Sequence, residues 1–395
     1  MTQHRLEVAD VFRQYKQEFF ARWGHTLSAA QRKVFHDICA CRTAALGARF
    51  EQCNHCSHQA ILYHSCRNRH CPKCQTTARD HWLDRTAREL LPVPYSHVVF
   101  TLPGALAPLV RQNTKLIYNL LFRCVSETLL TIARDPSRLG AELGLLAVLH
   151  TWNQKLLTHP HLHCLVPAGG FSPDRLRWIH SRKRFFLPSP VLAGMFRGKF
   201  LALLATAYRR KKLVLAGELQ PLQRPGAFDR FVSSLRKKKW VVDVRAPFGG
   251  PEHVLKYLAR YTHRVAISNG RLLELRGDQV TFRWRDSADG NKQKVMTIDA
   301  VEFIRRFLLH VLPPGFVKIR HFGFLANGCR REGLRLSRTL LQASPSPAPL
   351  TTRQRNAMEH KCPCCGIGTL CFLGYVPPDI LKALAVPTPV VLDSS

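Results

Sequence analysis

The chain has 395 residues, which suggests two or three domains and leaves ample length for a buried core. Lys and Arg number 59 against 26 Asp and Glu, giving a formal net charge of +33. An excess of this size indicates a polyanionic partner. Because the basic residues are spread along the chain and no amphipathic anchor is evident, nucleic acid is favoured over a membrane surface. No apolar run is long enough to span a bilayer, and the N-terminus lacks the apolar segment of a signal peptide, so we expect no membrane association.

The N-terminal part of the sequence predicts helices followed by a metal-binding module. Residues 1–48 carry apolar side chains at helical spacing, with Ser28 as the cap of a second helix. Residues 50–75 are rich in Cys and His, and a helix is predicted from about 77 to 91, where prolines end it. Without a signal peptide, the fourteen cysteines are better explained as reduced thiols and metal ligands in a cytoplasmic protein than as disulfides.

Two CxxC pairs carry the clearest metal-binding signal. They are separated by 14 residues, and four thiolates in two such pairs are typical of a tetrahedral structural zinc site. We therefore predict one Zn²⁺ ion bound by Cys53, Cys56, Cys71 and Cys74. Cys66, His64 and His70 lie between the pairs and could replace one ligand or bind a second ion. Buried free cysteines are the less favoured alternative.

Basic residues lie around this module, and a second group of cysteines lies in the tail. Arg67, Arg69 and Lys73 could contact DNA phosphates, although a solvated charged surface explains them equally well. In the tail, Cys362 and Cys365 form a single CxxC pair, and no second pair follows them. A second zinc site is therefore possible there, but a disordered or degenerate tail is the favoured interpretation. It follows a Ser-Pro-Ser-Pro-Ala-Pro linker over residues 344–349.

The middle of the chain predicts strands interleaved with helices. Strands are expected at 97–102, 143–150, 161–166 and 240–244, and a Gly-Asp turn joins a hairpin of 272–275 with 280–284. Helices are expected at 106–133, 189–210, 227–238, 251–262 and 301–311. The sequence therefore predicts an α+β fold with a mostly antiparallel sheet.

The strand at 161–166 carries a pair of histidines. His161 and His163 flank Leu162, so on a strand both imidazoles point to one face and Leu162 points into a core. Two adjacent imidazoles can hold a divalent cation. A third ligand is expected from Gln154, His150, His97 or His263, and Gln154 is slightly favoured because it lies just upstream. A pair of satisfied core histidines is the alternative.

Tyr257 and Tyr261 are four residues apart, so on a helix they share one face. Lys256, Arg260 and Arg264 flank that face and suit phosphate contact. Two buried core tyrosines are the alternative. A metal that polarises a phosphate beside two phenols could instead cut and rejoin a DNA strand through a phosphotyrosine.

Four segments in order resemble the transposases of the insertion sequence 91 family: Cys-Arg-Asn-Arg-His-Cys-Pro-Lys-Cys-Gln (66–75), His-Val-Val-Phe-Thr-Leu-Pro (97–103), His-Pro-His-Leu-His-Cys-Leu-Val-Pro (159–167) and Tyr-Leu-Ala-Arg-Tyr-Thr-His-Arg-Val-Ala-Ile-Ser-Asn (257–269). The resemblance spans roughly residues 10 to 330. It implies an HUH-type sheet with flanking helices, in which His161 and His163 bind Mg²⁺ or Mn²⁺ and Tyr257 and Tyr261 are nucleophiles. It also implies nicking and transfer of single-stranded DNA in rolling-circle transposition, by a bacterial protein associated with the nucleoid.

The expected domains are N-terminal helices with a zinc-binding module (1–92), an HUH catalytic transposase domain (93–330) and a linker with a cysteine-containing tail (331–395). Three other functions stay open. A zinc-dependent DNA-binding regulator without catalysis would need neither histidine nor tyrosine pairs. A metallohydrolase using activated water would form no covalent adduct. An inactive descendant of a mobile element would not cut DNA at all, but the intact motifs argue against this alternative.

Overall fold

The computed structural model of the chain describes residues 5–181, 188–248, 254, 266–286, 289–343 and 361–383. The chain divides into two compact units, each built from separated segments. The first unit comprises Met1–Asp80, His263–Leu308 and Ser346–Ser395, and the second comprises His81–Thr262 and Leu309–Pro345. This division differs from the predicted one, because the segment from 263 to 308 and the C-terminal tail both join the N-terminal part.

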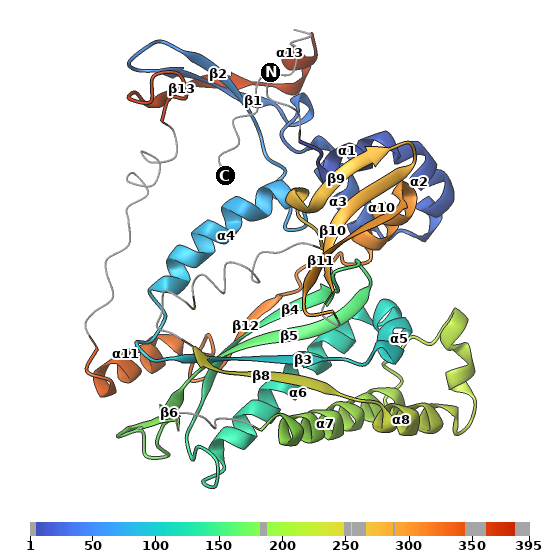
Figure 1. Cartoon of the computed structure of the whole chain (residues 1–395), viewed down its shortest axis with the longest axis vertical. Coiled ribbons are helices and arrows are strands. Elements are labelled where there is room, and N and C mark those ends of the chain that lie inside the picture. The colour runs from blue at the N-terminus through green and yellow to red at the C-terminus, as the bar shows by residue number, and fades with distance from the viewer. Residues whose placement is uncertain are drawn as a thin grey trace. The chain divides into compact units, whose positions relative to one another are not determined.

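A five-stranded antiparallel sheet forms the centre of the second unit (Figure 1). Its strands lie in the order β12-β4-β5-β3-β8. Their bounds are β3 Tyr95–Thr101, β4 Gly144–Trp152, β5 Thr158–Pro167, β8 Val241–Phe248 and β12 Ile319–Gly323. Four of these strands were predicted, and the α+β class with antiparallel pairing is confirmed. The edge strand β12 was not predicted, because its sequence Ile-Arg-His-Phe-Gly is short and polar.

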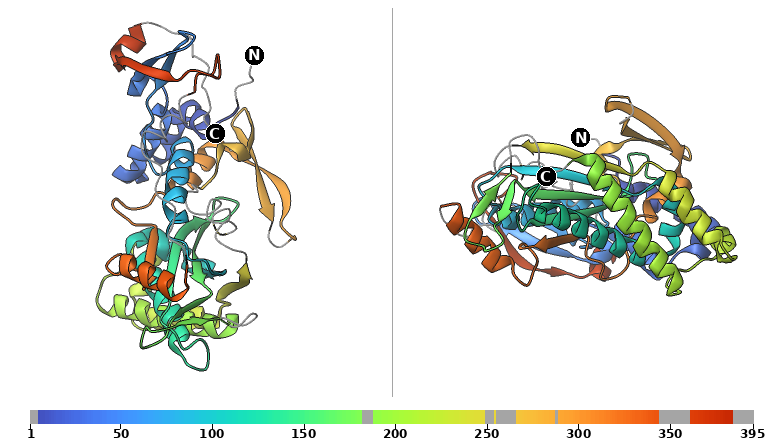
Figure 2. Two further views of the ribbon diagram at one scale, coloured as in Figure 1. Left: turned by 90° about the vertical axis from the view of Figure 1, so that its left-hand side faces the viewer. Right: turned by 90° about the horizontal axis from the view of Figure 1, so that it is seen from below.

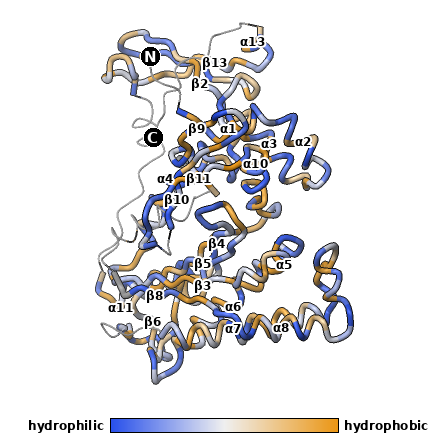
Figure 3. The backbone as a smooth tube through the Cα atoms, turned by 45° about the vertical axis from the view of Figure 1, so that its right-hand side comes forward, coloured by the Kyte–Doolittle hydropathy of each residue, from blue (hydrophilic) through white to orange (hydrophobic). Residues whose placement is uncertain are grey.

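Long helices cover one face of this sheet. α6 (Thr114–Arg134) and α7 (Ser189–Arg209) lie together on one side of the strands in Figures 1 and 2, with α5 (Ala107–Gln112) and α8 (Ala227–Lys237) beside them. Apolar residues of the strands and helices form one buried cluster between the two layers, and Figure 3 shows hydrophobic stretches in both the strands and the helices of this unit. By length and composition α6 and α7 could each cross a membrane, but such helices are also found in buried cores, and both pack in this cluster.

The opposite face of the sheet carries a smaller apolar cluster. It includes Tyr95, Leu146, Val148 and Leu165 of the strands together with Val254. α11 (Arg330–Leu340) contributes Leu334 to it, and the small ribbon of β6 (Gly169–Phe171) and β7 (Trp178–His180) contributes Phe171 and Trp178. Among the described residues this is the smaller of the two apolar clusters on the sheet, and it lies on the face to which the paired histidines point.

The first unit contains a helical core and a three-stranded sheet. The helices are α1 (Val8–Gln14), α2 (Lys16–Trp23), α3 (Ala29–Ala40) and α10 (Ala300–Leu308), and the sheet has the order β11-β10-β9. The strands are β9 Leu272–Arg276, β10 Gln279–Asp286 and β11 Lys292–Asp299. Phe12 stacks on Phe35 at 4.9 Å between ring centroids and meets Phe307 edge-on at 5.3 Å. The predicted hairpin and the capping role of Ser28 are confirmed.

A second small sheet in the first unit joins the two ends of the chain. It has the order β13-β1-β2, with β1 Ala48–Cys53, β2 Gln59–Tyr63 and β13 Leu370–Val376. α4 (Pro72–Ala87) follows the hairpin, and α13 (Pro378–Ala383) follows β13. Within the described residues, 3₁₀ helices are found at Gly24–Thr26, Ala44–Leu46, Gly104–Leu106, Gly217–Gln223 and Asn269–Arg271. The expectation of a disordered tail is thus wrong for residues 361–383.

Candidate functional site

The histidine pair lies on the central strand β5, with the predicted alternation. Leu162 and Cys164 are fully buried in the cluster that the helices cover. His161 pairs with Thr101 of β3, and His163 pairs with Val99 of the same strand, so both histidines point to the opposite face. Leu162 thus anchors the strand in the larger apolar cluster, while both imidazoles lie on the opposite face of the sheet.

A third histidine completes the group. His150 of β4 lies directly opposite His161 in the sheet register, and one nitrogen of each of His150, His161 and His163 lies within 4.8 Å of the others. The ring centroids are 4.4 Å apart for His150 and His163, and 4.9 Å apart for His161 and His163. Gln154, the favoured third ligand, is an exposed residue of the turn after β4. The sheet register therefore supplies His150 as a third imidazole, which the sequence offered only as one candidate among four.

Hydrogen bonds orient two of these rings. His161 Nδ1 lies 2.7 Å from the carbonyl oxygen of His159, so Nδ1 carries the proton and Nε2 keeps its lone pair. His163 Nδ1 lies 2.9 Å from Nε2 of His97 on β3, and the two rings are parallel within 6°. Metal-binding histidines commonly use one ring nitrogen for the metal and the other for such a partner, which fixes the tautomer. This pattern fits a metal site and identifies His97 as a positioning residue.

Burial favours the neutral form of His161 and His97. It lowers the pKa of His161 to about 4 and the pKa of His97 to about 3, because an imidazolium loses its hydration there. A smaller contribution to the shift of His97 comes from the positive charge of Arg245. Neutral imidazole is the form that binds a metal, so His161 can coordinate a cation at neutral pH. Three imidazoles over this span fit one divalent ion.

The predicted nucleophiles lie outside the described residues. This applies to Tyr257 and Tyr261, to the basic residues around them (Lys256, Arg260 and Arg264), and to His263. Val254, three residues before Tyr257, is described and fully buried in the apolar cluster on the histidine face of the sheet. The chain therefore reaches that face just before the tyrosine segment.

The structure groups the cysteines differently from the prediction. Cys53 and Cys56 do not share a cluster with Cys71 and Cys74. Cys71 and Cys74 instead cluster with Cys41 and Cys66. The two CxxC pairs are separated because Cys53 and Cys56 lie at the turn of the β1–β2 hairpin, whereas Cys71 and Cys74 lie at the start of α4.

The cluster of Cys41, Cys66, Cys71 and Cys74 has the dimensions of a zinc site. Cys74 Sγ lies 3.6 Å from Sγ of both Cys41 and Cys66. Zn–S bonds of about 2.3 Å in a tetrahedron separate neighbouring sulfurs by about 3.8 Å. Cys71 and Cys74 lie at the N-terminus of α4, where the helix dipole stabilises thiolates. Cys41 stands in no CxxC pair, so cysteine spacing did not predict it as a ligand.

The basic residues near this cluster have different surroundings. Lys73 forms an ion pair of 2.6 Å with Glu7, and only 14% of its side chain is exposed. Arg69 is half-buried, and burial lowers its pKa, whereas Arg67 is exposed. The charge of Lys73 is therefore already paired within the first unit.

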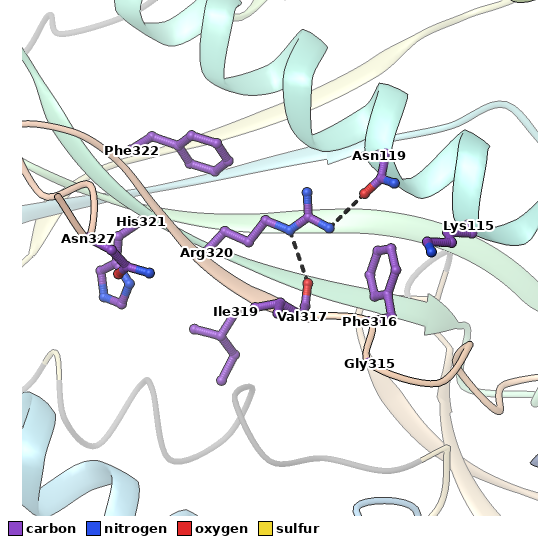
Figure 4. Close-up of a pocket in the computed structure, with 10 residues that line it drawn as sticks. All are labelled: Lys115, Asn119, Gly315, Phe316, Val317, Ile319, Arg320, His321, Phe322 and Asn327. Atoms are coloured by element: carbon purple, nitrogen blue, oxygen red, sulfur yellow. Dashed lines mark hydrogen bonds between the residues drawn. The ribbon is translucent and has the colours of Figure 1, made fainter.

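A basic pocket of about 370 Å³ opens beside the edge strand β12 of the second unit (Figure 4). Arg320 donates to Asn119 Oδ1 at 2.7 Å and to the carbonyl oxygen of Val317 at 3.0 Å, and its guanidinium lies over the ring of Phe122. Lys115 and His321 also line the pocket. The guanidinium is thus held in place at a concave site that suits an anionic group.

Two family models match the chain, one toward its N-terminus and one over its middle. A family described as "Transposase zinc-binding domain" matches residues 11–102, and one described as "Putative transposase" matches residues 144–332. "Putative transposase y4qJ" of Sinorhizobium fredii is 52% identical over 92% of this chain and 94% of that protein. "Transposase for insertion sequence element IS801" of Pseudomonas savastanoi pv. phaseolicola is 27% identical over 87% of this chain and 85% of that protein. No solved structure matches the chain.

Proposed function

We propose that this chain, which belongs to the insertion sequence 91 family of transposases, nicks and transfers single strands of a mobile element through 5′-phosphotyrosine intermediates. The observation that carries the proposal is the cluster of His150, His161 and His163 on one face of the central strands. A transposase acts on DNA, and the formal charge of +33 suits a phosphate backbone. We expect the protein to act in the bacterial cytoplasm, where the chromosome lies.

The metal of this site is proposed to be bound by the three histidines. When bound there, a divalent cation would withdraw charge from the non-bridging oxygens of the scissile phosphate. Imidazole donors suit the later first-row metals better than Mg²⁺, which prefers carboxylate and water oxygens. We therefore expect Mn²⁺ to support cleavage at lower concentration than Mg²⁺. Gln154 stays an alternative third ligand that the experiment below can separate from His150.

The two tyrosines are proposed to be the nucleophiles. A phenol has a pKa near 10, so it must lose its proton as it attacks. The phenol oxygen forms a bond to phosphorus, the bond from phosphorus to the 3′-oxygen breaks, and that oxygen takes up a proton. The products are a 5′-phosphotyrosine and a free 3′-hydroxyl. The 3′-hydroxyl of another strand then attacks the phosphorus of the phosphotyrosine. A new bond from phosphorus to the 3′-oxygen forms, the bond to the tyrosine oxygen breaks, and the phenol takes up a proton.

The location of Val254 supports this assignment. It is buried on the histidine face of the sheet, three residues before Tyr257 in the chain. Two tyrosines four residues apart would share one helical face, so one could hold the first cut end while the other attacks a second phosphate. Lys256, Arg260 and Arg264 are proposed to contact the phosphates around the cut.

The covalent adduct distinguishes this function from its alternatives. Purified full-length protein is incubated with Mn²⁺ and a labelled single strand of the element end, and the products are separated under denaturing conditions. We expect a protein-linked label that the double variant Tyr257→Phe/Tyr261→Phe does not form. Tyr208→Phe, a matched change on α7 elsewhere in the second unit, should form it normally.

Three outcomes would contradict the proposal. Binding without cleavage would favour a zinc-dependent regulator, and cleavage without adduct would favour a metallohydrolase. An adduct in the double variant would show that another residue is the nucleophile. His163→Ala should abolish the adduct while DNA affinity stays largely unchanged, because the many basic residues provide that affinity.

A further inference from the structure

A second cluster of four thiols joins two distant parts of the chain within the first unit. Cys53 and Cys56 lie at the end of β1 and in the turn after it, and Cys362 and Cys365 lie before β13. Cys56 and Cys362 are 306 residues apart in sequence. The family matches end at residues 102 and 332, so neither includes the C-terminal pair.

The sulfur distances have the size expected for a tetrahedral zinc site. Cys53 Sγ lies 3.8 Å from Cys365 Sγ, and Cys56 Sγ lies 3.6 Å from Cys362 Sγ. Four sulfurs about 2.3 Å from one zinc ion would be about 3.8 Å apart. A disulfide would need an S–S distance of about 2.05 Å. The cluster thus has the spacing of metal ligands and not of bonded sulfurs.

Backbone amides stabilise thiolates in both halves of the cluster. The amide of His55 donates to Cys53 Sγ at 3.3 Å, and the amide of Gly368 donates to Cys365 Sγ at 3.3 Å. Hydrogen bonds to sulfur favour the charged form, which is the form that binds zinc. In each turn, a backbone amide two or three residues after a cysteine therefore donates a hydrogen bond to its sulfur.

The two turns also contact each other closely. The amide of Thr369 donates to Asn54 Oδ1 at 2.9 Å, and the amide of Asn54 donates to the Thr369 carbonyl at 3.2 Å. A Cβ atom on Gly368 would clash with Cys53 Sγ, so a larger residue would force the turns apart. Beyond this contact, Cys53 and Leu370 begin the antiparallel pairing of β1 with β13.

We propose that Cys53, Cys56, Cys362 and Cys365 bind a second zinc ion, which fastens the C-terminal tail to the N-terminal hairpin. β13 has little apolar burial of its own, since the side chains of Phe372, Leu373 and Tyr375 are 50%, 53% and 73% exposed. The strand therefore depends on the metal to stay paired with β1, and loss of zinc frees the tail while the first cluster stays intact.

Counting tightly bound zinc tests this inference. Full-length protein is passed over a chelating resin to remove loosely bound metal, and its mass is then measured under native conditions. We expect two zinc ions per chain in the wild type and one in Cys362→Ser/Cys365→Ser. Cys364→Ser is the matched control, because this exposed thiol lies between the two ligands and belongs to neither cluster, and it should keep two. The zinc that His163→Ala loses relative to the wild type is assigned to the histidine cluster. It is subtracted before the ions bound by cysteines are counted.

Hydrogen exchange supplies a second readout. In Cys362→Ser/Cys365→Ser the amides of β13 should lose protection, while those of β4 keep theirs and show that the second unit is folded. One zinc ion in the wild type, two in the double variant, or unchanged protection of β13 would each overturn the inference. Should the double variant not fold, the zinc count of the wild type decides alone. None of these measurements involves DNA cleavage, so their failure is separate from failure of the proposed transposase chemistry.

Discussion

Replacing His97 by Phe should weaken metal binding at the histidine cluster without disturbing the sheet. His97 is 2% exposed, and its Nε2 lies 2.9 Å from Nδ1 of His163. If His163 binds the metal through Nε2, its proton must be on Nδ1, and His97 accepts that proton in a hydrogen bond. In the metal-free protein His163 can change tautomer when this acceptor is removed, but the metal-bound state cannot. Losing this hydrogen-bond acceptor therefore raises the free energy of the metal-bound protein and not that of the metal-free protein.

The expected size of the effect follows from that hydrogen bond. Loss of such a partner of a metal-binding histidine typically costs 10–100-fold in metal affinity, which corresponds to about 1.4–2.8 kcal/mol. Losing the acceptor of a buried donor costs about 1–3 kcal/mol, which agrees with this range. Titration calorimetry with Mn²⁺ measures the affinity directly. His97→Gln keeps an oxygen acceptor and should recover part of the loss.

His321→Phe is the matched control. His321 is a half-buried histidine of β12 in the same sheet, outside the group of His150, His161 and His163. Its substitution should leave Mn²⁺ affinity unchanged. An unchanged affinity in His97→Phe, or an equal loss in His321→Phe, would refute the argument that the bond between His97 and His163 selects the metal-binding tautomer.

Three further predictions concern the same unit. His150→Ala should reduce Mn²⁺ affinity and cleavage more than Gln154→Ala does, and the reverse order in calorimetry and nicking assays would make Gln154 the third ligand. Leu162→Ala, at a fully buried position, should lower the free energy of unfolding by about 2–5 kcal/mol in urea titrations, whereas Leu157→Ala, at a position 42% exposed, should change it by less than about 0.5 kcal/mol. Burial lowers the pKa of His310 from 6.5 to about 4, so the unfolded chain binds more protons between these pH values and stability falls as the pH falls through them. In His310→Gln, the free energy of unfolding lost between these pH values should be smaller by up to about 3 kcal/mol, as measured by urea titrations at several pH values. An unchanged loss would contradict the assignment.

The sequence alone determined the features that depend on local periodicity. Alternation over residues 161–166 placed Leu162 in the core and the histidines on the other face, and the structure confirms it. Runs of apolar residues likewise predicted the strands and helices around it, because side-chain burial at regular spacing is a property of a short segment. The transposase family followed from four motifs in order, and the comparisons confirm it.

Only the tertiary structure decided which distant residues meet. His150 joined the histidines because β4 pairs with β5 in a register that sets His150 opposite His161. That register depends on the geometry of the turn between the two strands, which the spacing of the histidines along the chain does not reveal. The cysteines were divided between two clusters for the same reason. Two CxxC pairs 14 residues apart look like one site, but the β1–β2 hairpin directs Cys53 and Cys56 toward the C-terminal tail, while α4 keeps Cys71 and Cys74 with Cys41 and Cys66. Zinc requires four sulfurs at fixed separations in space, and chain folding, not spacing along the chain, sets those separations.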